Sequence, residues 1–236
     1  FRTVKKPFVK PKTEINPAKK KVEDYLKLRG FSKSTWEKYG VGESGGNIAF
    51  PFYENGELVL MKFRKPEKYN GKGQKEWREE GGKAVLWGMD LCEPDTDLVI
   101  TEGQMDTLAL AECGIKNVLS VPSGSKDLSW IDNCWDWLQK YENIVFWGDN
   151  DEPGKEMVKK CTLRLSDWKC YVVNSEHKDA NISLARDGKE KTKEAVINAK
   201  LVPINGLIDL ADVTHLDIEH IPRVRSGLVS LDREIG

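Results

Sequence analysis

Cysteine and histidine, the usual ligands of zinc, are scarce in this sequence of 236 residues. It contains five cysteines and three histidines. No two cysteines form a Cys-x-x-Cys pair, and the histidines do not supply the missing ligands, so a zinc site is not expected. Free and mostly buried thiols in a reducing compartment are expected instead.

Long apolar runs are also absent. No stretch is long enough to span a membrane, and the first residues lack the pattern of a secretory signal. The motif G-x-x-x-x-G-K-[ST] does not occur, so the phosphate-binding loop of an ATPase is missing from this sequence. A length of 236 residues gives room for one or two compact domains with hydrophobic cores.

Charge is distributed unevenly along the chain. Residues 1–83 contain 20 Lys/Arg and 11 Asp/Glu, whereas residues 84–236 contain 17 and 27. A basic lobe joined to an acidic lobe suits a protein that grips a polyanion with one half and carries out metal chemistry with the other. The alternative is that the lysine-rich surface only aids solubility.

Carboxylates directly follow two predicted strands. The apolar run at 144–148 ends in Asp149-Asn-Asp151, and the run at 97–101 ends in Glu102. Open α/β sheets bind ligands at this carboxyl edge of their strands. Side chains two residues apart share a strand face, and two carboxylates placed so repel each other unless a cation such as Mg²⁺ neutralises them. The pattern predicts a metal site, and the alternative is a solvated turn whose Asp caps the next helix.

The order of these motifs resembles the Toprim domain of primases, topoisomerases and some nucleases. The matching residues are Thr101-Glu-Gly-x-x-Asp106 and, later, Asp149-x-Asp151-x-x-Gly154. The segments Val121-Pro-Ser-Gly-Ser125 and His177-Lys-Asp-Ala-Asn181 resemble the bifunctional primase–helicases of phages and the related Twinkle helicases of mitochondria. Together with residues 28–53, the resemblance covers about residues 22–200.

The resemblance implies a DNA primase, and we expect Glu102, Asp149 and Asp151 to be catalytic. Two Mg²⁺ or Mn²⁺ ions are expected at these three residues and at Asp179. Basic side chains are expected to bind nucleotide and DNA: Lys62, Arg64, Lys65, Lys68, Lys126 and Lys178.

Three residues have simpler explanations. The alternative for Asp179 is an Asx-type helix cap, and the alternative for Lys126 is a plain helix start at Asp127. Asp106 is better explained as a residue of the first turn of a helix, favoured by the helix dipole, than as a metal ligand.

The predicted function is the synthesis of short RNA primers on single-stranded DNA from ribonucleoside triphosphates, by metal-dependent nucleotidyl transfer. Expected partners are the DNA template, the ribonucleotides, a helicase domain of the same chain and a DNA polymerase, but no membrane. The expected location is the cytoplasm of a phage-infected bacterial cell or the matrix of an organelle.

Two other functions are compatible with a Toprim domain. One is a catalytically silent, DNA-binding appendage of a hexameric replicative helicase, against which the presence of Glu102, Asp149 and Asp151 argues. The other is a nuclease or topoisomerase, but a topoisomerase needs a nucleophilic tyrosine in a separate domain for which this chain has little room.

The predicted fold is α/β, with a Toprim parallel sheet flanked by helices and preceded by a small basic α+β subdomain. The predicted divisions are a basic linker at 1–19, the N-terminal subdomain at 20–95, the Toprim catalytic domain at 96–200, and, at 201–236, a linker with the start of a RecA-like helicase domain. The resemblance also implies a zinc-binding module ahead of the first residue.

Hydrophobic periodicity and turn residues predict the individual elements. In the first part, helices are expected at 20–29 and 34–39, and strands at 48–53 and 57–64 around a hairpin turn at Glu54-Asn-Gly56, followed by a polar loop to 83 and a short strand at 84–87. In the second part, strands at 97–101, 117–121, 144–148 and 170–173 alternate with helices near 104–113, 127–140, 153–166 and 189–199. A further helix is expected within 204–217.

Overall fold

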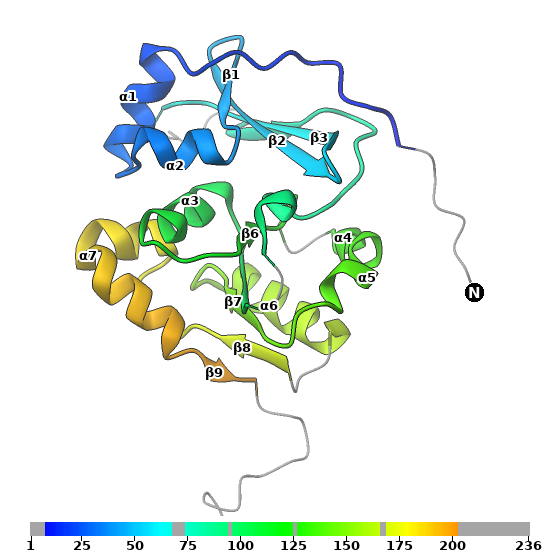
Figure 1. Ribbon diagram of the computed structural model, residues 1–236. Coiled ribbons are helices and arrows are strands. Elements are labelled where there is room, and N and C mark those ends of the chain that lie inside the picture. Colours follow the sequence, from blue (N-terminus) through cyan, green and yellow to red (C-terminus); the bar gives the residue numbers. More distant parts are fainter. Residues whose placement is uncertain (1–7, 68–73, 94–95, 125–126, 166–168, 203–236) are drawn as a thin grey trace, which may run out of the picture. The chain divides into compact units, whose positions relative to one another are not determined.

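The computed structural model describes residues 8–67, 74–93, 96–124, 127–165 and 169–202 (Figure 1). These residues belong to one compact unit, residues 1–202. They form a four-stranded and a five-stranded β-sheet. The helix predicted within 204–217 and the predicted start of a helicase domain lie outside the described residues.

The first sheet is antiparallel, in the order β1-β2-β3-β4. Its strands are β1 (Gly42–Ser44), β2 (Asn47–Glu54), β3 (Glu57–Arg64) and β4 (Glu76–Arg78). As predicted, β2 and β3 form a hairpin, and both turn residues have positive φ, 53° at Asn55 and 78° at Gly56. This is the conformation that an Asn-Gly hairpin turn favours.

Two helices accompany this sheet. Helix α1 (Lys20–Leu28) buries Val22 and Leu26, four residues apart on one helix face, and α2 (Lys33–Lys38) buries Trp36. Both helices were predicted within one or two residues, because apolar residues at helical spacing alternate here with exposed lysines.

Two predictions for the following segment are wrong. Residues 76–78 form β4 inside the predicted polar loop, where they pair with Lys62–Arg64 of β3. Residues 84–87 form no strand, and only Trp87 makes an isolated bridge, to Ser120. The pairing partner decides the formation of β4, because the edge of β3 supplies backbone hydrogen-bonding groups regardless of how polar the paired residues are.

The second sheet has the order β6-β5-β7-β8-β9. Its strands are β5 (Leu98–Thr101), β6 (Val118–Ser120), β7 (Ile144–Trp147), β8 (Cys170–Val172) and β9 (Lys200–Leu201). Three of the four pairings, β6–β5, β5–β7 and β7–β8, run parallel, as the alternation of strands and helices predicted, and the short β9 runs antiparallel to β8.

Helices cover both faces of this sheet, which confirms the predicted α/β class. They are α3 (Gln104–Glu112), α4 (Ser129–Asn133), α5 (Trp135–Leu138), α6 (Glu152–Leu165) and α7 (Ala180–Ile197), with a 3-10 turn at Met89–Leu91. Successive strand residues point to opposite faces. Ile100 and Phe146 therefore join one buried cluster with Met157 of α6, while Val99 and Trp147 join another with Leu110 of α3.

Two helices depart from their predicted bounds. The helix predicted at 127–140 divides at Cys134, whose φ and ψ of −103° and 7° are not helical. Helix α7 begins at Ala180 rather than near 189, and it is kinked at Gly188, where φ is 79°. A positive φ suits glycine, so this residue interrupts the helix without the strain that a larger side chain would meet.

Trp87 packs between the two sheets. Its ring centroid lies 4.9 Å from that of Tyr39 and 5.4 Å from that of Phe50, and its backbone N–H donates to the carbonyl of Ser120 at 2.9 Å. The Tyr39 hydroxyl donates to the carbonyl of Val118, also at 2.9 Å. The small sheet is thereby attached to β6 of the parallel sheet.

Glu112, at the end of α3, makes a second connection. Its carboxylate accepts hydrogen bonds from the backbone N–H of Ser32 at 3.0 Å and the hydroxyl of Thr35 at 2.6 Å, and Lys189 of α7 donates to it at 2.8 Å. Although burial opposes it, these donors lower the pKa of Glu112 to about 2. One carboxylate thus joins the start of α2 to α3 and α7.

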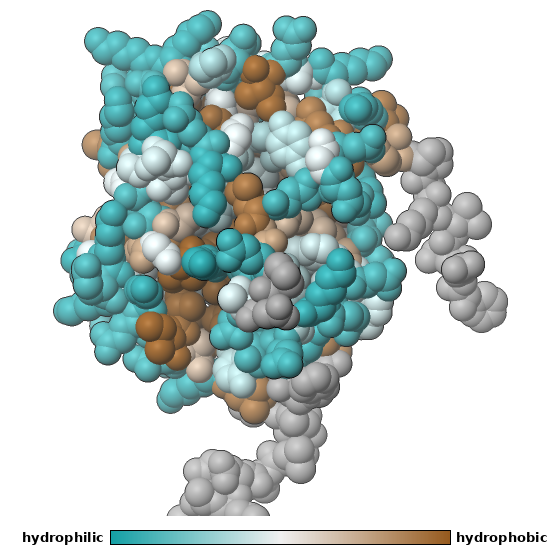
Figure 2. Space-filling model, in the orientation of Figure 1, coloured by the Kyte–Doolittle hydropathy of each residue, from teal (hydrophilic) through white to brown (hydrophobic). Residues whose placement is uncertain are grey.

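The face shown in Figure 2 is covered mainly by hydrophilic residues, with hydrophobic ones in scattered patches. Within the described part of the chain, no helix combines the length and the apolar character needed to cross a membrane.

Candidate active site

Acidic side chains gather where β5 and β7 end. Thr101, the last residue of β5, pairs in register with Trp147, the last residue of β7. Glu102 therefore lies beside the start of the loop that carries Asp149, and the backbone N–H of Asp149 donates to the Glu102 carboxylate. This is the meeting of strand tips that the sequence predicted.

The carboxylates at this edge oppose each other's ionisation. Burial, followed by the charges of Glu102 and Asp179, raises the pKa of Asp149 to about 6. Burial, with a contribution from Asp151, also raises the pKa of Glu102. A nearby cation would relieve this repulsion, because it stabilises the ionised form of each group.

Lys178 supplies one positive charge at this edge. Its Nζ lies 3.8 Å from Oδ2 of Asp149 and 3.4 Å from Oδ2 of Asp151. The side chain of Lys178 is 57% exposed, so the ammonium group can leave without breaking a buried contact. Lys178 was predicted to bind nucleotide or DNA, and the structure places it against the two aspartates.

Two of the predicted metal ligands also cap helices. Oδ1 of Asp151 accepts a hydrogen bond from the N–H of Gly154 in the first turn of α6, at 3.1 Å. Oδ1 of Asp179, the N-cap of α7, accepts from the N–H of Ile182 at 2.7 Å. Capping uses one oxygen of each carboxylate. The helix-cap alternatives therefore describe real contacts of both residues, and their role in metal binding stays a prediction.

Asp106 is the acidic residue whose environment sequence reasoning missed. It lies in the first turn of α3, as expected, but it is buried, and its Oδ1 accepts a hydrogen bond from the N–H of Asn181 at 3.1 Å. Burial, followed by the charges of Asp179 and Asp149, raises the pKa of Asp106 to about 8. Its place in the Glu-Gly-x-x-Asp motif, four residues after Glu102, was the available signal.

Two glycines leave room for these carboxylates. A Cβ atom at Gly103 would lie 2.9 Å from Oδ2 of Asp106, and one at Gly124 would lie 3.0 Å from Oε1 of Glu102. The Pro-Ser-Gly-Ser loop that contains Gly124 therefore approaches Glu102 directly. The close approach of a carboxylate therefore explains why glycine occupies each of these two positions.

The donor set fits a hard divalent cation, because such ions prefer carboxylate oxygens and Oε2 of Glu102 is buried without a hydrogen-bond partner in the described part of the chain. The oxygens do not converge on one point, however. Across the described residues, no three His, Cys, Asp or Glu side chains are arranged to hold a metal ion. The edge offers suitable ligands, but they do not form a closed cage.

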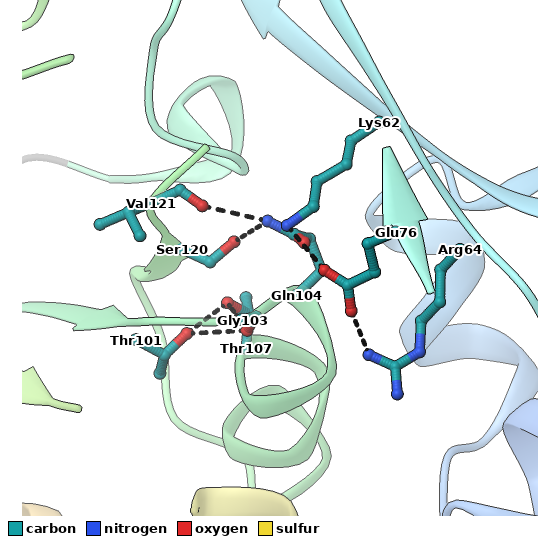
Figure 3. A network of polar contacts seen from close by, with 9 residues as sticks. All are labelled: Lys62, Arg64, Glu76, Thr101, Gly103, Gln104, Thr107, Ser120 and Val121. Carbon is teal, nitrogen blue, oxygen red and sulfur yellow. Dashed lines mark hydrogen bonds and ion pairs between the residues drawn. The ribbon is translucent and has the colours of Figure 1, made fainter. Parts of the chain in front are cut away.

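Two basic side chains of the small sheet lie on β3 and face a carboxylate of β4 (Figure 3). Lys62 and Arg64 lie two residues apart on β3, and the charge of Lys62 acts on Glu102. Both basic side chains form ion pairs with Glu76 of β4. Lys65 follows the end of β3, with its N–H bonded to the carbonyl of Lys75 at 3.2 Å. Lys68 and Lys126 lie outside the described residues.

A neutral hydrogen-bond network fixes the strand tips beneath these charges (Figure 3). The side-chain amide of Gln104 donates to Oγ of Ser120 at 2.8 Å and to the carbonyl of Val121 at 3.2 Å. The hydroxyls of Thr101 and Thr107 lie 2.8 Å apart. The network joins the ends of β5 and β6 to the start of α3, so the backbone beside Glu102 is held on both sides.

The family comparison agrees with this geometry. Residues 99–184 match the family described as Toprim-like, and this part of the chain has the Toprim fold that its motifs predicted. The predicted resemblance to the primase region of primase–helicases is also confirmed, by relatives in sequence and by a solved structure of similar fold.

Two plant relatives come from Arabidopsis thaliana. The Twinkle homolog protein, chloroplastic/mitochondrial, is 33% identical over 225 residues, which are 84% of this chain and 31% of the relative. The Primase homolog protein is 32% identical over 217 residues, 81% of this chain and 63% of the relative. The chain thus spans less than two thirds of either relative.

Among solved structures, the primase fragment of the bacteriophage T7 primase-helicase protein is similar in fold. The TM-score is 0.62 at 24% sequence identity, over 82% of this chain and 83% of the fragment. Because the match extends over 82% of this chain and either sheet alone spans far less, the match includes residues of both sheets.

Proposed function

We propose that this chain is the catalytic core of a DNA primase, which makes short RNA primers on single-stranded DNA. The observation that carries the proposal is the position of Lys62. Lys62 lies on β3 of the basic sheet, where it pairs with Glu76 of β4, and its charge also favours the ionised form of Glu102 at the acidic edge. Phosphate-binding and metal-binding groups on one site are what nucleotidyl transfer requires.

In the proposed reaction, the 3′-hydroxyl of one ribonucleotide attacks the α-phosphate of the next. A bond forms between that oxygen and the phosphorus, the bond to the leaving pyrophosphate breaks, and the hydroxyl proton goes to a base. Divalent cations, when bound, neutralise the phosphates and lower the pKa of the attacking hydroxyl. Asp149 and Asp151 would hold them, together with Asp179 and Glu102.

Glu102 is also the candidate acceptor of that proton. Its raised pKa brings it closer to the pH at which a general base works best. Because Oε2 of Glu102 is buried without a hydrogen-bond partner in the described residues, this oxygen can take up a proton without losing a contact. Glu102 is therefore suited to both roles, metal ligand and base.

Basic groups would bind the triphosphate and the template. Lys62 and Arg64 share one strand face, and Lys65, Lys68, Lys126 and Lys178 are proposed to contribute further phosphate contacts. Lys178 would exchange its present contacts with Asp149 and Asp151 for a phosphate when cations bind, since ammonium and metal compete for the same oxygens.

The proposal extends to a longer protein. The resemblance to primase–helicases supports a helicase domain in the same chain, hexameric and ATP-dependent, and a DNA polymerase as partner. It also supports the proposed divisions at residues 19, 95 and 200. A plant relative named chloroplastic/mitochondrial supports an organellar location, and a relative from Mycobacterium phage D29 supports an infected bacterial cell.

The second candidate is a catalytically silent Toprim domain that only binds DNA beside a replicative helicase. The absence of a closed metal cage among the described carboxylates favours it, as do the capping roles of Asp151 and Asp179. The presence of all the motif carboxylates, with pKa values raised at Glu102, Asp106 and Asp149, favours the enzyme.

One assay separates the two candidates. The chain is incubated with single-stranded template, labelled ribonucleoside triphosphates, and either Mg²⁺ or Mn²⁺. A primase produces short RNA oligomers that require both template and divalent cation. A chain that binds the template and makes no oligomers with either cation is the silent appendage.

A further inference from the structure

Glu76 holds two of the basic side chains that the proposed function assigns to phosphate binding (Figure 3). Its Oε2 lies 3.1 Å from Nζ of Lys62, and its Oε1 accepts a hydrogen bond from Nη1 of Arg64. The β3–β4 register sets Arg64 directly opposite Glu76, and Lys62 reaches the same carboxylate from two residues earlier. The carboxylate therefore bridges both cations.

The bridge is largely shielded from water. The side chains of Lys62, Arg64 and Glu76 are 12%, 10% and 30% exposed. A partly buried, charge-assisted pair is stronger than one on the open surface, because solvent screens it less. Glu76 consequently occupies donors that a phosphate group would need.

Positive charge is still in excess around this bridge. Lys75 has a pKa below its usual range because of burial and then because of the charge of Arg64. The Nε–H groups of Arg64 and Arg29 are buried and have no hydrogen-bond partner in the described residues. Arg64 as a whole is only 8% exposed. Unpaired buried donors are costly, and an anion richer in oxygen than one carboxylate would satisfy them.

We propose that Glu76 is a built-in competitor for the phosphate group that Lys62 and Arg64 bind. Without a ligand, the carboxylate neutralises both side chains and holds them in place. To bind, a phosphate group must replace it, and this exchange favours groups with more charge and more acceptor oxygens than a carboxylate. The inference rests on the proposed function, because that function makes Lys62 and Arg64 phosphate-binding groups.

The inference is tested by whether one substitution raises or lowers the affinity for a nucleotide. Glu76→Gln keeps the shape of the side chain but removes the competing charge. We expect the Kd for Mg·ATP, measured by calorimetry, to fall about fivefold. A change of this size is typical when one competing charge is removed. The Kd for adenosine, which has no phosphate, should not change. A residue that merely positions Lys62 and Arg64 would give the opposite result, a weaker affinity for Mg·ATP.

Two further arms complete the experiment. Glu57→Gln removes the same charge from an exposed residue at the other end of β3, and it should bind Mg·ATP as the unchanged protein does. Fluorescence anisotropy with single-stranded DNA shows which phosphate is involved. Tighter binding of ATP alone assigns the exchange to the triphosphate, and tighter binding of DNA alone assigns it to the template backbone.

An unchanged or weaker affinity of Glu76→Gln for both ligands overturns the inference. If the Glu76→Gln variant does not fold, Glu76→Asp is used in its place, because the shorter carboxylate keeps the charge and cannot span both cations. An affinity of Glu76→Asp no greater than that of the unchanged protein then overturns the inference. Failure of the proposed function is recognised separately, because primer synthesis by the unchanged protein tests that function without reference to Glu76.

Discussion

The acidic strand tips and the basic antiparallel sheet each contain one side chain of opposite charge, Lys178 and Glu76. The two regions differ in how far that side chain compensates the charges around it. Lys178 reaches Asp149 and Asp151, yet burial and neighbouring carboxylates raise the pKa of Asp149 to about 6. At the basic sheet, burial also disfavours the charge of Glu76, but Lys62 and Arg64 outweigh it and lower the pKa of Glu76.

The difference shows which region depends more on a bound ion. One exposed lysine does not compensate the carboxylates at the acidic edge, so the edge favours either protonation or cations. The basic sheet has an internal counterion in close contact, so its ligand has to displace a bond that already exists. Cations are therefore expected to change the acidic edge more than phosphate changes the basic sheet.

The contact between the two regions can be broken at Trp87. Trp87→Ala should lower the free energy of unfolding by about 3–5 kcal/mol, because it leaves a cavity where the side chain packs against Tyr39 and Phe50. Urea denaturation measures the loss. Trp135→Ala, at a side chain that is 42% exposed, is the control and should change stability by less than about 0.5 kcal/mol. Similar losses in both variants would show that Trp87 does not join the sheets.

The second connection can be removed at Glu112. Glu112→Ala should cost about 2 kcal/mol, because the N–H of Ser32 and the hydroxyl of Thr35 lose their acceptor. The folded pKa of Glu112 is depressed, so its contribution is complete above its usual pKa of 4.5 and is lost as the pH falls towards about 2. The gap between the two urea curves should therefore narrow below pH 4.5. Glu190→Ala, on the exposed side of α7, serves as control, and a gap independent of pH would contradict the role given to the Glu112 charge.

The repulsion at the acidic edge can be reduced at Asp106. Its folded pKa is raised, so the charged form destabilises the fold, and stability should decline as the pH rises from the usual pKa of 3.8 towards about 8. Asp106→Asn keeps an acceptor for the N–H of Asn181. It should raise the Tm at pH 9, in the presence of a chelator, by a few degrees and leave it unchanged at pH 5. A lower Tm at pH 9 would mean that the Asp106 charge is compensated.

The smallest effect concerns the basic sheet. Replacing Lys62 and Arg64 with Gln should reduce the slope of log affinity for single-stranded DNA against log salt by about 1.4, as expected for two lost phosphate contacts. The control replaces Lys191 and Lys193, exposed on α7, and should keep the slope. An unchanged slope in the Lys62/Arg64 variant would place the template groove elsewhere.

Sequence reasoning found the features that depend on local pattern. The strand ends at Glu102 and Asp149 follow from apolar runs that stop at carboxylates, and the hairpin follows from Asn55-Gly56. It missed β4, because Glu76 and Arg78 form a strand only through pairing with β3. It also missed the burial of Asp106, which depends on the start of α7, 75 residues later in the chain. Contacts that are remote in sequence leave no periodic signal.

Primer synthesis by a double variant tests the central claim, that the carboxylates at the ends of β5 and β7 carry the chemistry. Asp149 and Asp151 are both changed to Asn, and circular dichroism establishes that the variant is folded. The matched control changes Asp24 and Asp136, two exposed aspartates, to Asn. We expect template-dependent RNA oligomers from the unchanged protein and the control, and none above background from the Asp149/Asp151 variant. Normal oligomer yield from that folded variant would contradict the central claim.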